Sequence, residues 1–377
     1  MKVEITDDKI FNALSPKDLR SYLLSKDWKC AKQVDKTFSI WELNAEGQKY
    51  RIWLPEDYNL GDFSHAMSRT IKTLAIAESR SQLELLEDID TLTLGDVIRV
   101  RTFDPMNKTS SSLPFEYGVS VIQRAKSLVI AGACATVEKK ALFPARKYSQ
   151  VAEYSKTLRL GQTERGSFIT KVISPIAIKQ KQIDIDPFER QSIITMLEAL
   201  DALHYVANET IKRGRFYFES FEEVVSQGVS ALLCDAVTGE LNEQGYQQTE
   251  INVSWFYNEL INKPSTKTHL LFDSNMMPYI KEASNKFYER NPEDFFAEGY
   301  IIALHREKQE GDGVITILNF DDFGKKRKIK IKLHEQDYNT AINAHKDGLP
   351  IECKGSIEKE GRSSIIDYPD NFHVVSE

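Results

Sequence analysis

The sequence has few of the residues that make a catalytic or metal site recognisable. Its four cysteines, Cys30, Cys134, Cys234 and Cys353, lie far apart and form no CxxC pair. This spacing indicates free thiols, which are typical of a reducing cytosol, and not a disulfide framework or a zinc site. The seven histidines contain no HExxH or HxH pair. We therefore expect a cytoplasmic protein without a metal or a cofactor.

Glycine-rich phosphate loops and nucleophile motifs are also missing. The chain has no P-loop, no dinucleotide fingerprint, no GxSxG elbow and no kinase signature. One acid–lysine pair, Glu352 and Lys354, has the spacing found in nucleases that hold Mg²⁺, but no aspartate falls on a neighbouring strand to complete that site. The sequence therefore predicts no catalytic residue. The alternative is a nuclease whose site the sequence does not reveal.

Long apolar runs and an excess of positive charge are absent as well. No run reaches the ~18–20 apolar residues of a membrane span, and residues 1–8 lack the apolar segment of a secretory signal. We therefore expect no contact with a membrane. The net charge of −7 argues against a generally basic surface, so contact with nucleic acid requires a local patch. At 377 residues we expect two or three domains.

Residues 1–101 are predicted to form a small α+β domain. Ser15 and Pro16 are suited to the start of a helix, and Gly47 is suited to the loop of a hairpin. The expected elements are a helix over 15–27, a hairpin of 37–43 and 48–54, one long helix over about 62–88 and a strand over 96–101.

The order helix, hairpin, helix resembles double-stranded-RNA-binding folds and the small HicA-type toxins. The likeness covers the elements up to the second helix. The HicA pattern places a histidine in the first strand of the hairpin, where this chain has Phe38 and Ser39, and His65 follows the hairpin. The resemblance therefore implies an architecture and no RNase activity.

Residues 115–290 are predicted to form a second domain, mixed α/β and mainly helical, after a turn-rich boundary at 102–114. Its first helix is apolar on most sides, which predicts a central, buried position. The expected elements are helices over 117–139, 186–211, 221–237 and 277–290, two alternating strands within 158–170, and a strand over 249–255.

Four arginines in these two regions are candidate anion contacts. They are Arg99, Arg101, Arg159 and Arg165. The first two fall on one face of a predicted strand, and the last two lie beside glycines that allow a phosphate to approach the backbone. The alternatives are a solvated strand face for the first two and an ordinary hairpin with a bulge for the others.

Residues 292–377 are predicted to form a small all-β barrel of the OB type with one helix. The expected elements are strands over 296–305, 313–320 and 326–333, a helix over 335–346, and strands over 350–357 and 364–368. A helix between the third and fourth strands of a five-stranded barrel is the OB arrangement, which often binds single-stranded nucleic acid.

The third barrel strand alternates basic and apolar residues. Lys328, Lys330 and Lys332 take one face, and Ile329, Ile331 and Leu333 take the other. The apolar set is expected to fill the barrel and the lysines to face outward. OB domains bind across the second and third strands, with basic groups for phosphates and aromatic rings for bases. The candidate nucleic-acid contacts are Lys325, Lys326, Arg327, Lys328, Lys330, Lys332, Phe320, Phe323 and Tyr300.

Two segments, residues 161–167 and 338–355, resemble bacterial proteins encoded in mobile and antiphage-defence gene clusters. The resemblance implies an accessory or sensor subunit that works with a partner enzyme. We therefore expect a non-enzymatic accessory protein that binds single-stranded nucleic acid through its barrel and has a protein partner. Outward lysines also keep a strand soluble, so a scaffold subunit that docks protein through the barrel is the alternative.

Overall fold

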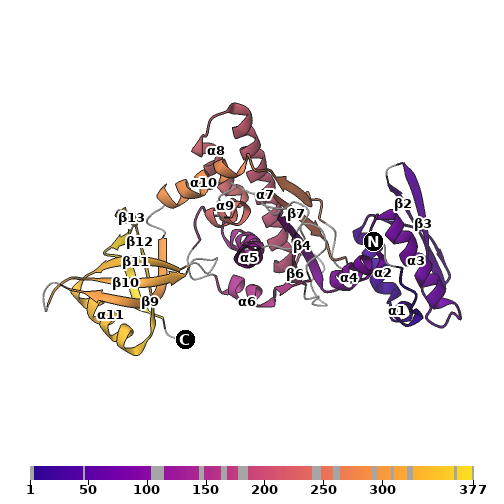
Figure 1. Cartoon of the computed structure of the whole chain (residues 1–377), viewed down its shortest axis with the longest axis horizontal. Coiled ribbons are helices and arrows are strands. Elements are labelled where there is room, and N and C mark those ends of the chain that lie inside the picture. Colours follow the sequence, from indigo (N-terminus) through magenta and orange to yellow (C-terminus); the bar gives the residue numbers. More distant parts are fainter. Residues whose placement is uncertain are drawn as a thin grey trace.

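The fold mixes helices with antiparallel sheets and ends in a curled sheet, as the sequence predicts (Figure 1). The structure is a computed structural model that describes residues 4–45, 47–102, 114–143, 148–162, 168–176, 186–239, 248–257, 264–290, 295–306, 310–320, 326–360 and 363–375. Its buried apolar side chains form three clusters, which run from Phe11 to Val97, from Ile98 to Phe287 and from Ala297 to Ile366. They follow one another along the length of the molecule (Figure 1).

The first cluster lies between helices and one face of a three-stranded antiparallel sheet. The elements are α1 (Asp8–Asn12), α2 (Pro16–Ser25), β1 (Lys29–Val34), β2 (Phe38–Ala45), β3 (Gln48–Pro55), α3 (Phe63–Ala77) and α4 (Gln82–Leu92). Ser15 caps α2 as predicted, with its side chain accepting from the Asp18 N–H. Trp41 and Ile52 point into the cluster from the predicted hairpin. Strand β1 adds a third strand that the sequence did not predict.

The single helix predicted over about 62–88 is wrong, because the chain breaks between α3 and α4. Ser79 takes a positive φ of 54°, which ends α3. Ser81 then starts α4 with a capping box, in which its hydroxyl accepts from the Glu84 N–H and the Glu84 carboxylate accepts from the Ser81 N–H. The hydrophobic period hides this break because both helices turn their apolar side chains into the same cluster.

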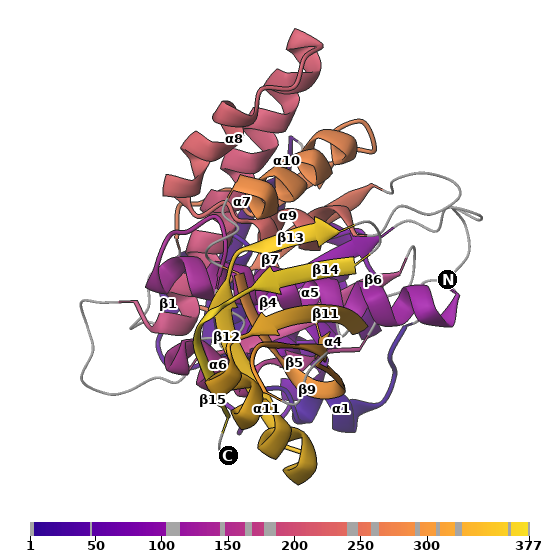
Figure 2. The same ribbon diagram turned by 90° about the vertical axis from the view of Figure 1, so that its left-hand side faces the viewer.

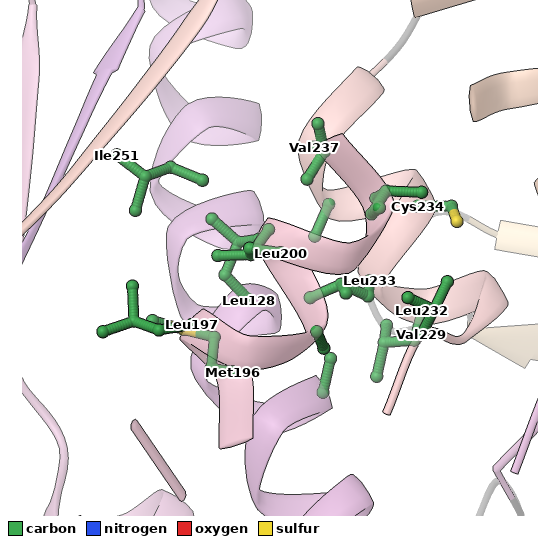
Figure 3. Packing of buried hydrophobic residues seen from close by; sticks show 14 of the residues in the cluster. Leu128, Met196, Leu197, Leu200, Val229, Leu232, Leu233, Cys234, Val237 and Ile251 are labelled. Atoms are coloured by element: carbon green, nitrogen blue, oxygen red, sulfur yellow. The ribbon is translucent and has the colours of Figure 1, made fainter. Parts of the chain in front are cut away.

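The middle region packs helices against a five-stranded sheet of order β5-β6-β4-β7-β8. Its elements are β4 (Gly95–Thr102), α5 (Phe115–Val137), α6 (Ser149–Thr157), β5 (Arg159–Leu160), β6 (Ile169–Pro175), α7 (Phe188–Arg213), α8 (Phe218–Glu223), the 3-10 turn η1 (Val224–Gln227), α9 (Ala231–Thr238), β7 (Thr249–Ser254), β8 (His269–Phe272) and α10 (Met277–Arg290). Helix α5 is mostly buried from Val121 to Ala135, which agrees with its predicted central position, whereas its first two turns are exposed or half-buried. Figure 3 shows Leu128 of α5 beside Leu200 of α7 and Leu233 of α9.

The helix predicted over 221–237 is wrong in its continuity. Gly228, at φ 103°, ends η1, and the hydroxyl of Ser230 then accepts from the Leu233 N–H to cap α9. The region that reads as one helix is therefore α8, η1 and α9 in succession.

Strand β4 connects the first region to the middle sheet. It pairs with both β6 and β7, so the strand at the end of the first predicted domain is the central strand of the middle sheet. Val97 packs in the first cluster, whereas Ile98 packs in the second. Asp88 of α4 lies across the same junction. We name it, with its cationic partners Arg80, Arg99 and Lys171, the Asp88 cluster.

The C-terminal sheet is curled and partly barrel-like, in the order β13-β14-β11-β10-β9-β12-β15, and is compatible with an OB-like fold (Figure 2). The elements are β9 (Phe295–His305), β10 (Gly313–Phe320), β11 (Lys326–Leu333), α11 (Glu335–Asp347), β12 (Pro350–Gly355), β13 (Ile357–Glu360), β14 (Ser363–Asp367) and β15 (Asp370–Val374). Strand β11 pairs in parallel with β14, and the other strand pairs are antiparallel.

The strand predicted over 350–357 is divided, and its division curls the sheet. Strand β12 pairs with β9, whereas β13, which begins two residues after β12 ends, pairs with β14. Gly355 lies at this bend, where a Cβ would stand 2.7 Å from Cγ2 of Ile366. The missing side chain therefore allows the close approach. Helix α11 covers the third cluster with Tyr338, Ala341 and Ala344. Strand β15 was not predicted.

Candidate nucleic-acid interface

The basic strand β11 has the predicted two-faced character. Ile329, Ile331 and Leu333 are buried in the third cluster. Lys328 and Lys330 are exposed, and both alternate with the buried residues. Because neighbouring side chains of a strand point to opposite faces, the buried set fixes the two lysines on the outside of the sheet.

Two neighbouring strands complete this outer surface. Tyr300 of β9 stands opposite Leu318 of β10, which stands opposite Lys328 of β11. In the next row Thr316 stands between Ala303 and Lys330. Residues directly opposite one another share a face of the sheet, and the Tyr300 side chain is 51% exposed. The structure therefore brings the predicted ring and the two predicted lysines onto one surface.

A bulge in β9 adds an apolar residue that the sequence analysis missed. Thr316 pairs with Ala303 and Ile317 with Ile301, so Ile302 is the extra residue and is 42% exposed. No local pattern marks it, since a bulge is a property of the pairing with β10. We name the surface formed by Tyr300, Ile302, Leu318, Lys328 and Lys330 the barrel face.

The positive charge is concentrated at one end of the barrel face. Lys332 lies 2.9 Å from the carboxylate of Asp367, so its charge is partly offset within the chain. Beyond it, Asp312 accepts from the Tyr368 hydroxyl at 3.1 Å and lies 3.6 Å from Nδ1 of His334. The hydrogen bond to Asp312 raises the pKa of Tyr368. Among the described lysines of β11, Lys332 therefore has an ion pair that partly offsets its charge, and Lys328 and Lys330 are the exposed ones.

For the other residues predicted to contact nucleic acid, the structure describes only the backbone or nothing at all. Phe320 and Lys326 pair with each other, and Arg327 pairs with Asn319, which places their backbone at the same end of the sheet as Lys328. The positions of their side chains are not described. Lys325 and Phe323 lie outside the described residues.

The four arginines that were predicted to contact anions differ in their surroundings, and two of them pair with carboxylates. The Arg99 guanidinium lies 2.7 Å from Asp88 and donates to the Ser254 hydroxyl at 2.9 Å. Arg101 lies 3.3 Å from Glu250. Arg159 is exposed on β5, which pairs with β6 as a hairpin, and Arg165 lies outside the described residues. Arg99 and Arg101 thus each have a carboxylate partner inside the chain.

Glu352 is buried in β12 at 8% exposure. It stands between Glu298 of β9 and His373 of β15 in the strand register, and its Oε2 has no hydrogen-bond partner among the described residues. The part of the chain that the structure describes contains no group of three or more histidine, cysteine, aspartate or glutamate side chains placed to hold a metal ion.

No protein-family model, curated protein or solved structure matches this chain. Among the helices in the described ranges, none combines the length and apolar character that crossing a membrane requires.

Proposed function

We propose that this protein is an accessory subunit that binds single-stranded nucleic acid through the barrel face and acts with a partner enzyme. The proposal is supported above all by the register that sets exposed Lys328 and Lys330 beside exposed Tyr300. Ammonium groups attract phosphates, and an exposed ring offers a surface on which a base stacks. The sequence resemblance to defence-cluster proteins favours bacterial genome defence as the setting.

A single strand fits this surface better than a duplex does. The basic residues lie on a sheet face, next to an aromatic ring and the apolar side chains of Ile302 and Leu318. A duplex hides the faces of its bases in the stack, whereas a single strand can present them to a ring. The net charge of −7 also disfavours long-range attraction of nucleic acid to the rest of the molecule.

Protein docking through the same face is the second candidate, favoured by its exposed apolar side chains Ile302 and Tyr300. The two functions differ in their response to salt. Phosphate contacts release counterions, so binding weakens steeply as salt rises, with a slope of about 0.7 per phosphate contact on a single strand. A barrel that only docks protein gives no such binding.

The test measures binding of full-length protein to labelled oligothymidylate and oligouridylate by fluorescence anisotropy over a range of salt. Replacing both Lys328 and Lys330 by Gln is expected to weaken binding and to reduce the salt slope by about 1.4. Lys346→Gln, an exposed lysine on α11, serves as the matched control. Absence of binding at low salt, or equal loss in the control, would refute the proposal.

A further inference from the structure

In the part of the chain that the structure describes, one face of the N-terminal sheet, which we name the open face, carries side chains that are mostly exposed or half-buried. Its other face carries Trp41, Ile52 and Leu54 into the first cluster. On the open face Trp53 is 55% exposed, while Trp28, Trp41 and Trp255 are each 2% exposed. One tryptophan of four is therefore presented to solvent, at a position where the strand pairing holds its backbone.

The strand register places other apolar side chains around Trp53. Ile40 stands opposite it on β2, and Phe38 lies on the same face in the next row, opposite Val34 of β1. The rings of Phe38 and Trp53 are 5.3 Å apart between centroids and tilted by 34°. Phe38, Ile40 and Val34 are half-buried. The centre of the open face is thus an aromatic and aliphatic platform.

Cations surround this platform. Lys32 stands in the row of Ile40 and Trp53, and Lys29 stands in the row of Glu42 and Arg51. Glu42 is the carboxylate of these rows, and it binds both Lys49, at 2.7 Å, and Nε of Arg51, at 2.8 Å. Among the described strand residues on this face, the cations are Lys29, Lys32, Lys49 and Arg51 and the carboxylate is Glu42, which leaves an excess of positive charge beside the exposed ring of Trp53.

We infer that this open face is a second binding surface for single-stranded nucleic acid, with Trp53 and Phe38 stacking on bases and Lys32 and Lys29 contacting phosphates. A polyanion that carries planar rings complements both the charge and the rings of the face. The open face lies on the sheet β1-β2-β3, whereas the barrel face lies on the C-terminal sheet, and the two surfaces share no residue. It therefore extends the proposed function to a second site.

Fluorescence gives a specific test because the other three tryptophans are buried. Oligothymidylate or oligouridylate added to the full-length protein at low salt is expected to quench the emission of Trp53. Trp53→Leu is expected to remove the quenching and to lower the affinity of that site roughly fivefold to a hundredfold. Trp53→Phe keeps a ring, so most of the affinity is retained. Ile76→Ala, at an exposed apolar residue of α3, is the matched control.

Heparin, a polyanion without bases, separates stacking from charge. We expect it to compete with the oligonucleotide for the lysines without quenching Trp53. Equal quenching by heparin, or unchanged oligonucleotide affinity in both Trp53 variants, would overturn the inference. Circular dichroism confirms that each variant is folded.

The same experiment distinguishes binding at the open face from binding at the barrel face. Quenching that persists when Lys328 and Lys330 are replaced by Gln supports a site independent of the barrel face. A wild-type protein that binds through the barrel lysines but shows no quenching refutes this inference and leaves the proposed function intact. If Trp53 is quenched but replacing Lys328 and Lys330 by Gln changes neither the affinity nor the salt slope, the inference is supported and the proposed function is refuted.

Discussion

Replacing Asp88 by Asn should loosen the junction between the N-terminal region and the middle sheet. The Asp88 side chain is 1% exposed and lies 2.6 Å from Arg80 and 2.7 Å from Arg99. Lys171, also 1% exposed, lies 3.5 Å away. The substitution removes the negative charge but keeps the shape, so three cations lose their common partner. Lys171 retains Glu87, at 2.9 Å.

The size of the effect follows from the pKa of Asp88. Burial alone would raise this pKa, but the charges of Arg99, Arg80 and Lys171 outweigh burial and lower it from 3.8 to about 2. Each unit corresponds to about 1.4 kcal/mol, so the charged carboxylate contributes roughly 2 kcal/mol to stability at pH 7. The three cations keep other partners, Glu78 for Arg80, the Ser254 hydroxyl for Arg99 and Glu87 for Lys171. They nevertheless lose one carboxylate at a largely buried site, which adds to the loss, and we expect Asp88→Asn to cost about 2 to 4 kcal/mol.

The sign of the pH dependence gives a second test. Because the folded-state pKa is depressed, this stabilisation is complete above about pH 4 and is lost as the pH falls toward 2. The wild type and Asp88→Asn should therefore differ most at neutral pH and converge in acid. Hydrogen exchange of α4 and β4 measures the local opening free energy at neutral pH, and urea unfolding at a series of lower pH values follows the convergence.

Asp90→Asn is the matched control, since Asp90 is an exposed carboxylate on the same helix. It should change the opening free energy little. The reasoning fails if the amides of α4 and β4 are as well protected from hydrogen exchange in Asp88→Asn as in the wild type. It also fails if the difference in unfolding free energy between the two proteins does not shrink below pH 4.

Three further predictions concern the barrel. A Cβ on Gly313 would lie 2.3 Å from the Tyr338 ring, so Gly313→Ala should destabilise the barrel by about 1–3 kcal/mol in thermal unfolding; Gly61→Ala, with open space around it, should not. A fragment of residues 292–377 should unfold cooperatively on heating, because its apolar cluster is complete by itself, and a broad, non-cooperative melt would contradict this. The purified protein should not cleave single- or double-stranded DNA or RNA with Mg²⁺ or Mn²⁺ in a gel assay; cleavage that disappears in Glu352→Gln would reveal a nuclease site in β12.

The barrel strands were predictable because their signals are local. Strands β10 and β11 have the predicted bounds, and α11 extends one residue beyond its predicted end. Alternation fixes which residues of a strand share a face, and turn residues fix where the strand ends. The sequence predicts a curled, barrel-like sheet, but the division of one predicted strand into β12 and β13 was not predictable in this way. The division depends on β12 pairing with β9 and β13 pairing with β14, and the sequence of neither segment indicates its partner strand.

The N-terminal sheet shows a different limit. Alternation along the hairpin puts Trp41 and Trp53 on opposite faces, but both faces are apolar enough to be a core. The face that carries Trp41 is the buried one because helices α2 and α3 cover it. Strand β1 was missed because all of Lys29–Val34 is exposed or half-buried, so its sequence has no buried period.

The arginines show why charge is harder to interpret than apolar pattern. Alternation puts Arg99 and Arg101 on one face of β4, opposite to Ile98 and Val100. Whether that face meets a ligand depends on what packs across it. Here α4 supplies Asp88 to Arg99 from the preceding helix, and β7 supplies Glu250 to Arg101 from far along the chain. Neither partner follows from the strand sequence.

The two proposed surfaces together make a prediction about the length of the bound strand. The barrel and the N-terminal sheet lie at opposite ends of the molecule (Figure 1). A short oligonucleotide can occupy only one surface at a time. A strand long enough to reach both makes its second contact intramolecularly, so its affinity gains from a high effective concentration. Affinity should therefore rise steeply once a threshold length is passed. Either Trp53→Leu or the double Lys328 and Lys330 replacement should remove that rise, because each leaves one surface. Affinity that grows smoothly with length, with no threshold and no loss in either variant, would show that the two surfaces do not share a strand.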